Sequence, residues 1–363
     1  MVDLCWPTAG TPNSPRLVPF GSARWLAAAC LLSLAACSAD SASDDADGGP
    51  TGPAGTTPTE SNLRVAFIGD QGLGPDSVAV LELIRDEGAD FVIHSGDFDY
   101  VDDPDAWDDQ ITGVLGDDYP YFANVGNHDV AEWEGYRAKL EQRLAKIDGV
   151  QCSGAELGVQ SACTYRGLFF ILSGVGTWGF VDHRAFVDQA LAADDSIWRV
   201  CTWHVTRADF QVGSKGNEAP LDVYQRCAAE RAFIVNGHEH SYSRTLSLSD
   251  VGNAAAGYGA TGTPDEMWVT EGSAFVAVSG LGGVNARDYH ADEHDDDTWW
   301  AAIYAEGRHL TGGQDASDFN YTFGALFVDF HVDSDPRKAR GYFKNIAGEV
   351  IDEFSITTDR RLP

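Results

Sequence analysis

Short apolar runs alternate with longer amphipathic stretches in the first half of the region that can fold. Apolar runs rich in branched residues predict strands at 63–68, 91–94 and 121–125. Apolar residues at helical spacing predict helices at 77–87, 104–115 and 131–147. This alternation predicts a mainly parallel sheet covered by helices, with functional loops at the carboxyl ends of its strands.

The second half of the chain has a different pattern. Apolar runs at 168–172, 198–203 and 232–235 predict further strands, with a helix at 221–229 between the last two. After them, strands are predicted at 267–270, 274–279, 323–332, 340–344 and 350–356, with few helices between them. We therefore expect an α/β fold in which these later strands form a second sheet packed on the first.

The N-terminal segment differs from the rest in composition. Arg16 and Arg24 precede an apolar run at 25–36, which suits a secretory signal and is too short to span a bilayer, since spanning takes about 20 residues. From 38 to 62 the chain is mostly Ser, Asp, Ala, Gly, Pro and Thr, which bury too little apolar surface to offset the cost of ordering. We expect a disordered tether here and a folded domain over 63–363.

The apolar run ends in the sequence LAAC at 34–37, which resembles a bacterial lipobox. The resemblance implies that residues 1–36 are a lipoprotein signal peptide, removed before Cys37, and that Cys37 carries a lipid at the start of the tether 37–62. Ser38, where inner-membrane lipoproteins carry Asp, favours an exported protein anchored in the outer membrane, on its periplasmic or surface face. An ordinary signal peptide with a coincidental cysteine, or a buried helix, is the alternative.

The cysteine content fits an exported protein, and the charge excludes one class of partner. The chain has 24 Lys and Arg against 56 Asp and Glu, a net charge of -32, which argues against nucleic acid as a partner and leaves the lipid anchor as the only expected contact with a membrane. Three of the seven cysteines fall in the signal or at its cleavage site, which leaves four in an oxidising compartment. We favour pairing Cys152 with Cys163 and Cys201 with Cys227; free buried thiols are the alternative.

Five loop motifs place metal-binding side chains directly after predicted strands. They are Gly69-Asp70-Gln71-Gly72, Gly96-Asp97-Phe98-Asp99-Tyr100, Gly126-Asn127-His128-Asp129, His204, and Gly237-His238-Glu239-His240. Carboxylates, a phenol, an amide and imidazoles gathered at one sheet edge can bind two metal ions, and this mixture suits iron, zinc or manganese. Each motif alone is weak, but all five in order are a strong signal.

In this order the motifs resemble those of the calcineurin-like metallophosphoesterase superfamily and, within it, of the purple acid phosphatases. The resemblance covers most of 63–283 and implies a four-layer α/β/β/α sandwich of two mixed sheets flanked by helices. Gly72 stands where most of the superfamily has a ligand His, and Tyr100 stands where the purple enzymes place a tyrosinate on ferric iron. Gln71 and Asp129 depart from the purple pattern, which usually has Trp and Glu there.

Carried over to this sequence, the resemblance implies two metal ions. The first, Fe(3+), would be bound by Asp70, Asp97, Tyr100 and His240, and the second, Fe(2+), Zn(2+) or Mn(2+), by Asp97, Asn127, His204 and His238, with Asp97 bridging. His128 is the expected catalytic residue, protonating the leaving alkoxide or holding the phosphate. Tyr242 and Arg244 could bind the substrate phosphate, or have an ordinary buried hydrogen-bonding role.

The function that the resemblance implies is hydrolysis of a small phosphate monoester, as in acid phosphatases, by metal-held hydroxide attacking phosphorus with His128 assisting the leaving group. A phosphodiesterase or nucleotidase on the same metal core is the alternative within enzymes. A non-catalytic surface binding protein is the alternative outside them. The oligomeric state, the natural substrate and the metal identities stay open.

Overall fold

We describe a computed structural model over residues 58–179 and 181–360. The proposed signal peptide, Cys37 and all but the end of the tether lie outside these residues. Within the described part of the chain, the longest apolar helices fall short of what is needed to cross a membrane.

Seven strands form the first sheet, in the order β12-β19-β18-β17-β1-β2-β3. They are β1 (Leu63–Ile68), β2 (Phe91–His94), β3 (Tyr121–Ala123), β12 (Glu266–Val269), β17 (Gly324–Phe330), β18 (Lys338–Asn345) and β19 (Val350–Thr358). β1, β2 and β3 are parallel, as expected from the alternating pattern. β17 runs antiparallel to β1, with Phe330 opposite Leu63.

Ten strands form the second sheet, in the order β16-β15-β14-β9-β13-β8-β7-β6-β5-β4. They are β4 (Gln151–Glu156), β5 (Gln160–Tyr165), β6 (Leu168–Ser173), β7 (Arg199–Trp203), β8 (Phe233–Asn236), β9 (Tyr242–Thr245), β13 (Val276–Ser279), β14 (Trp300–Ala305), β15 (Arg308–Thr311) and β16 (Gln314–Asp315). β10 (Ser247–Leu248) and β11 (Ala260–Thr261) form a separate short pair. β6, β7, β8 and β13 are parallel neighbours.

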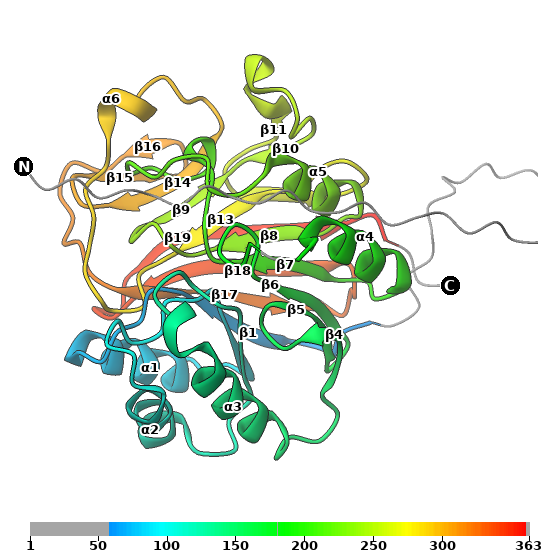
Figure 1. The fold of residues 1–363 in the computed structure, drawn as a ribbon. Coiled ribbons are helices and arrows are strands. Elements are labelled where there is room, and N and C mark those ends of the chain that lie inside the picture. The colour runs from blue at the N-terminus through cyan, green and yellow to red at the C-terminus, as the bar shows by residue number, and fades with distance from the viewer. Residues whose placement is uncertain (1–57, 180, 361–363) are drawn as a thin grey trace, which may run out of the picture. The chain divides into compact units, whose positions relative to one another are not determined.

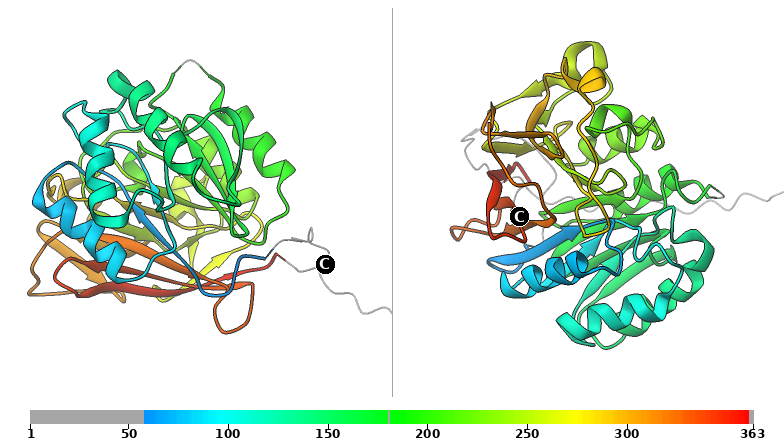
Figure 2. Two further views of the ribbon diagram at one scale, coloured as in Figure 1. Left: turned by 90° about the horizontal axis from the view of Figure 1, so that it is seen from below. Right: turned by 90° about the vertical axis from the view of Figure 1, so that its left-hand side faces the viewer.

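Helices cover the outer faces of both sheets (Figures 1 and 2). α1 (Pro75–Asp86), α2 (Pro104–Leu115) and α3 (Trp133–Leu144) pack on the first sheet, and α4 (His183–Ala193) and α5 (Leu221–Ala229) pack on the second. The remaining helical segments are α6 (Ala291–His294), η1 (Val130–Glu132), η2 (Ala208–Phe210) and η3 (Ala254–Gly259). The fold is therefore the expected α/β/β/α arrangement of two mixed sheets flanked by helices.

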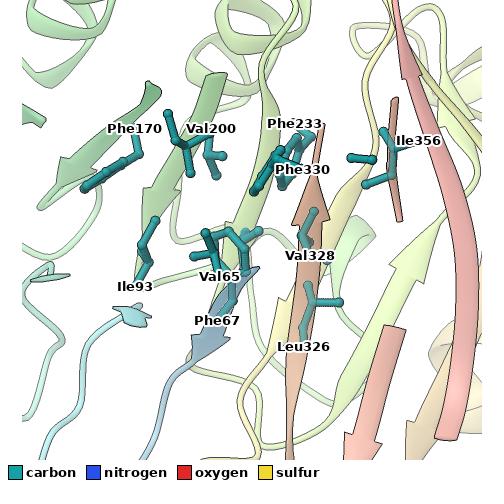
Figure 3. Close-up of a cluster of buried hydrophobic side chains, with 14 of the residues drawn as sticks. Val65, Phe67, Ile93, Phe170, Val200, Phe233, Leu326, Val328, Phe330 and Ile356 are labelled. Carbon is teal, nitrogen blue, oxygen red and sulfur yellow. The ribbon is translucent and has the colours of Figure 1, made fainter. Parts of the chain in front are cut away.

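The main core lies between the two sheets (Figure 3). Val65 and Phe67 of β1 face Val200 of β7 and Phe233 of β8, and all four side chains are fully buried. Side chains alternate along a strand, so Ala66 and Ile68 of β1 point to the opposite face and pack under α1. The continuous apolar pattern of β1 is thus explained by burial on both faces.

The predicted division of strands between the sheets is wrong. β17, β18 and β19 extend the first sheet beside β1, and the second sheet begins at β4 instead. The predicted helix at 131–147 is shorter in the structure, where α3 ends at Leu144. β4, β5, α4, β9 and β14 were not predicted, because their polar or small residues give no clear period.

Both predicted disulfides are present. Cys152 and Cys163 lie opposite each other on the antiparallel pair β4 and β5. Cys201 of β7 is bonded to Cys227 of α5, so the second disulfide ties the helix to the sheet that it covers.

Candidate metal centre

The motif side chains meet where strands of both sheets end. Asp70 and Asp97 follow β1 and β2 of the first sheet, whereas His204 and His238 follow β7 and β8 of the second. The expectation that they gather at the edge of one sheet is corrected accordingly. The two sheets come so close here that a Cβ added to Gly69 would lie 3.2 Å from the backbone of the loop after β8.

One set of side chains gathers around Asp70. The Tyr100 hydroxyl donates a hydrogen bond to Asp70 Oδ1 at 3.0 Å and lies 3.2 Å from His240 Nε2. His240 Nε2 lies 3.3 Å from the same Asp70 oxygen. A carboxylate, a phenol and an imidazole therefore converge through atoms that can bind a metal, as expected for the first ion.

A second set gathers around His204. His204 Nε2 lies 3.2 Å from Asp97 Oδ2, 3.1 Å from Asn127 Oδ1 and 3.1 Å from His238 Nδ1. The ligand atoms of Asp97, His204 and His238 all lie within 4.8 Å of one another. The two sets adjoin, since the backbone N–H of His238 donates to Asp70 Oδ2 at 2.8 Å. The residues expected to bind the two ions are thus brought together in two adjacent sets.

The charges of the site fit bound cations. Asp70 and Asp97 are fully buried, and neither pairs with Lys or Arg among the described residues. Burial alone would raise the pKa of Asp70, but the nearby charge of His240 and its hydrogen bond hold it below its usual range. Burial alone would lower the pKa of His204, but the charge of Asp97 and its hydrogen bond raise it to about 9. The buried carboxylates need positive charge nearby. Protonated histidine supplies such charge, and bound metal cations would supply it as well.

The backbone at the site is unusual. Asp70, Asp97, Tyr100 and His238 have φ angles of 60°, 61°, 63° and 69°, in the left-handed region that favours glycine. A residue other than glycine in this backbone conformation costs roughly 1–3 kcal/mol of stability. Such residues concentrate at functional sites, where the surrounding structure enforces the conformation. Four such residues in one cluster indicate that these side chains are oriented toward the site at a cost in stability.

Groups outside the motifs hold each histidine ring from its far side. Glu218 Oε2 lies 3.1 Å from His238 Nε2, and Asn285 Oδ1 lies 2.9 Å from His240 Nδ1. The carbonyl of Ser95 lies 2.8 Å from His204 Nδ1. In each case the other ring nitrogen faces the cluster, which is how partners of metal-binding histidines set the ring orientation. Sequence reasoning missed Glu218 and Asn285, because they stand in loops without a motif.

The two residues that depart from the purple pattern both have partners. Asp129 is buried and accepts hydrogen bonds from the backbone N–H groups of Asp97, Phe98 and Gly126. Gln71 turns toward α2 and bonds to the side chains of Gln110 and Tyr121. Asp129 therefore ties the loop after β3 to the loop after β2, whereas Gln71 belongs to packing beneath the site.

His128 lies at the exposed rim of the cluster. Its side chain is exposed, its ring centroid is 4.6 Å from that of Tyr100, and its backbone N–H donates to Asp97 Oδ1 at 2.9 Å. An exposed imidazole beside the buried ligands is accessible to a molecule that approaches from solvent.

Tyr242 and Arg244 do not line the cluster. Both are fully buried on β9, where Tyr242 donates to Asp352 Oδ2 at 2.7 Å and Arg244 contacts both oxygens of the Asp352 carboxylate. Asp352 belongs to β19 of the other sheet. Of the two roles considered, the structure supports the buried hydrogen-bonding role and corrects the expectation of substrate contact.

This fold and this cluster define a metallophosphoesterase. Residues 63–242 match the family model Metallophos, the calcineurin-like phosphoesterases. Over this region the chain belongs to the calcineurin-like phosphoesterase family, whose members are metal-dependent phosphoester hydrolases with a dinuclear metal centre.

A solved structure of low sequence identity shows the same fold. The purple acid phosphatase PPD1 from seeds of yellow lupin (Lupinus luteus) superposes with a TM-score of 0.58 at 17% identity, over 83% of this chain and 55% of the lupin chain. This chain therefore matches only about half the length of that protein. Two further structures reach TM-scores of 0.47 and 0.46: GAP50, the anchor in the inner membrane complex of Plasmodium (13% identity; 82% of this chain, 90% of that chain), and PhoD (10% identity; 81% and 67%). A search of curated proteins found no match.

Proposed function

We propose that this protein is a dinuclear metal-dependent hydrolase of phosphate monoesters, of the acid phosphatase type. The observation that carries the proposal is the pair of adjacent sets of ligand-type side chains, Asp70, Tyr100 and His240 beside Asp97, Asn127, His204 and His238. Two cations held there would lower the pKa of a bound water and neutralise charge on the phosphate ester.

Two residues have further proposed roles, Asp97 as a bridging ligand and His128 as a group that contacts the substrate. Asp97 belongs to the second set, and its backbone carbonyl accepts a hydrogen bond from the N–H of Gln71, the residue after Asp70, which places Asp97 beside the first set and suits a bridging carboxylate. His128 is exposed beside Tyr100 and would hold the phosphate or give a proton to the departing alkoxide. Its backbone hydrogen bond to Asp97 keeps this imidazole next to the ligands.

A substitution at Asp97 tests the proposal. Purified protein should contain two metal ions per chain and hydrolyse p-nitrophenyl phosphate, and Asp97→Asn should lose metal and activity together. Asp109→Asn, on the exposed side of α2, is the matched control. An Asp97→Asn protein that retains both ions and full turnover would refute the assignment.

We further propose that Tyr100 binds ferric iron as a tyrosinate, with Fe(2+), Zn(2+) or Mn(2+) in the second position. A phenolate is a hard ligand, and the motif that supplies Asp70 has Gly72 where a histidine ligand is otherwise expected. A visible charge-transfer band that disappears in Tyr100→Phe but persists in His128→Ala would support this. Zinc or manganese in both positions of the native protein would contradict it.

A phosphodiesterase or nucleotidase is the second candidate, because the same ligand sets serve either ester. The ratio of kcat/KM for p-nitrophenyl phosphate to that for bis(p-nitrophenyl) phosphate separates monoester from diester preference. Metal-loaded protein that turns over neither compound, nor any nucleotide, would favour a non-catalytic binding protein.

We also propose that the protein is exported and anchored through a lipid on Cys37 to the outer membrane. The two disulfides support export to an oxidising compartment. Cys37→Ser should release the protein from the membrane fraction, and unchanged partitioning would overturn the assignment.

A further inference from the structure

The loop between β7 and α5 packs against the metal centre at two points. Glu218, near its end, lies 3.1 Å from His238, and the backbone of Gly213 packs against the side chain of Glu239. Lys215 lies between these two contact points in the sequence. The loop thus carries a lysine along the border of the candidate site.

The turn that carries Lys215 is fixed by buried side chains. Gln211 is fully buried, and its amide donates to the carbonyl oxygens of Gly213 and Lys215, both at 3.1 Å. His294, also buried, holds the carbonyl of Gly213 at 2.9 Å from the other side. The position of Lys215 is therefore determined by packing and hydrogen bonds.

Among the described residues, the ammonium group of Lys215 forms no ion pair with a carboxylate. Most described lysines and arginines pair with a carboxylate, as expected in a chain with 56 acidic residues. Within the described residues, only Lys215, Lys338 and Arg360 lack such an ion pair. Lys215 is half-buried and differs from the other two in its place beside the candidate metal centre.

Charged groups of the candidate site lie near Lys215. Burial and the charge of Arg287 lower the pKa of the Lys215 ammonium, and the carboxylates of Glu218, Glu239 and Asp70 oppose that shift. The other nearby cation, Arg287, is already engaged, since its guanidinium donates to the carbonyl of His238 at 3.1 Å.

We propose that Lys215 is a specificity-determining residue that binds a non-bridging oxygen of the substrate phosphate and favours monoesters over diesters. The inference rests on the proposed phosphatase function and deepens it. A monoester dianion carries two charges on three non-bridging oxygens, whereas a diester carries one charge on two. An additional ammonium group beside the metal ions therefore stabilises the bound monoester more than the bound diester.

Three variants of the metal-loaded full chain test the role of Lys215. Lys215→Met removes the charge but keeps the apolar stem, Lys215→Arg keeps a positive charge, and Lys338→Met removes another lysine without an ion pair, on β18. Inorganic phosphate is the binding probe, measured by titration calorimetry. Steady-state rates on p-nitrophenyl phosphate and bis(p-nitrophenyl) phosphate supply KM and kcat for each variant.

In Lys215→Met we expect phosphate binding to weaken by about tenfold and the monoester KM to rise similarly, as for loss of one charge-assisted hydrogen bond. The diester KM should change much less. Lys215→Arg should recover most of the affinity, and Lys338→Met should match the native protein. Native affinity for phosphate in Lys215→Met, equal losses on both esters, or no phosphate binding by the native protein would each overturn the inference. Native protein that binds phosphate through Lys215 but hydrolyses neither ester would instead count against the proposed function alone.

Discussion

The carboxylate of Asp129 accepts a hydrogen bond from the backbone N–H of Asp97 at 2.8 Å, so the loop after β3 holds a ligand of the loop after β2 from behind. The same carboxylate also binds the backbone N–H groups of Phe98 and Gly126. Three backbone donors on one buried acid fix the conformation in which Asp97 faces His204. The ligand set therefore depends on a residue that does not itself face the cluster.

Asp129→Ala should loosen this arrangement. Three buried N–H groups would lose their acceptor, which should lower the free energy of unfolding by about 1–3 kcal/mol and the metal affinity by roughly 10–100-fold. Urea unfolding and competition with a metal chelator measure the two effects. Asp109→Ala, exposed on α2, serves as control. Native metal affinity in Asp129→Ala would show that Asp97 needs no such support.

Glu218→Ala should weaken the second metal position specifically. Removing the carboxylate 3.1 Å from His238 Nε2 frees the ring to turn and to change tautomer, so Nδ1 would no longer be held toward His204. We expect roughly a 10–100-fold loss of affinity for one of the two ions. Equilibrium dialysis resolves the two ions, with exposed Glu134→Ala as the matched change. Equal loss of both ions would argue for a general loosening of the loop.

The Arg244 and Asp352 pair should matter for stability and hardly at all for substrate. Arg244→Met would leave the buried Asp352 carboxylate with the Tyr242 hydrogen bond but without its cationic partner, a change that costs about 3–5 kcal/mol in comparable buried pairs. Chemical denaturation should show this loss, while the KM of the fraction that remains folded stays near native. A rise in KM without a loss of stability would restore the substrate-binding role.

Protonation of His183 should destabilise the protein at mildly acidic pH. Burial lowers its pKa below the 6.5 of the unfolded chain, and the ring contacts Ser173 Oγ and the carbonyl of Trp178. As the pH falls, the unfolded chain binds this proton at a higher pH than the folded protein does. The contribution of the neutral His183 to stability is therefore fully present above pH 6.5 and is lost as the pH drops below it. The slope for one proton is at most about 1.4 kcal/mol per pH unit. His183→Gln should reduce the difference in unfolding free energy between pH 8 and pH 5.5, and His290→Gln, at a partly exposed position, should not.

Local signals explain what the sequence predicted well. α2 begins at Pro104 and ends at Leu115, as predicted, because Asp103 caps its first turn through the N–H of Ala106 and Gly116 follows with a φ of 104°. The candidate ligands come together for a similar reason. Their loops follow buried strands, and the carboxyl ends of these strands meet where the two sheets adjoin.

What the sequence did not show depends on contacts between distant segments. No local pattern predicts that β17 pairs with β1. This pairing, with Phe330 opposite Leu63, depends on how the apolar faces of distant segments pack together. β4 was missed since its residues are mostly exposed and polar. Glu218 and Lys215 stand in a long loop without periodicity, and only the folded chain brings them to the histidines.

The pairing of β1 with β17 also limits how the chain can be divided. Residues 63–242, which match the family model, contain every candidate ligand but lack β17, β18 and β19. Expressed alone, this piece would expose the full edge of β1 and would remove Leu326, Val328 and Phe330 from the core between the sheets. A ribosome must pass residue 330 before β1, the strand that precedes Asp70, gains its antiparallel neighbour, so the metal centre is completed late in synthesis.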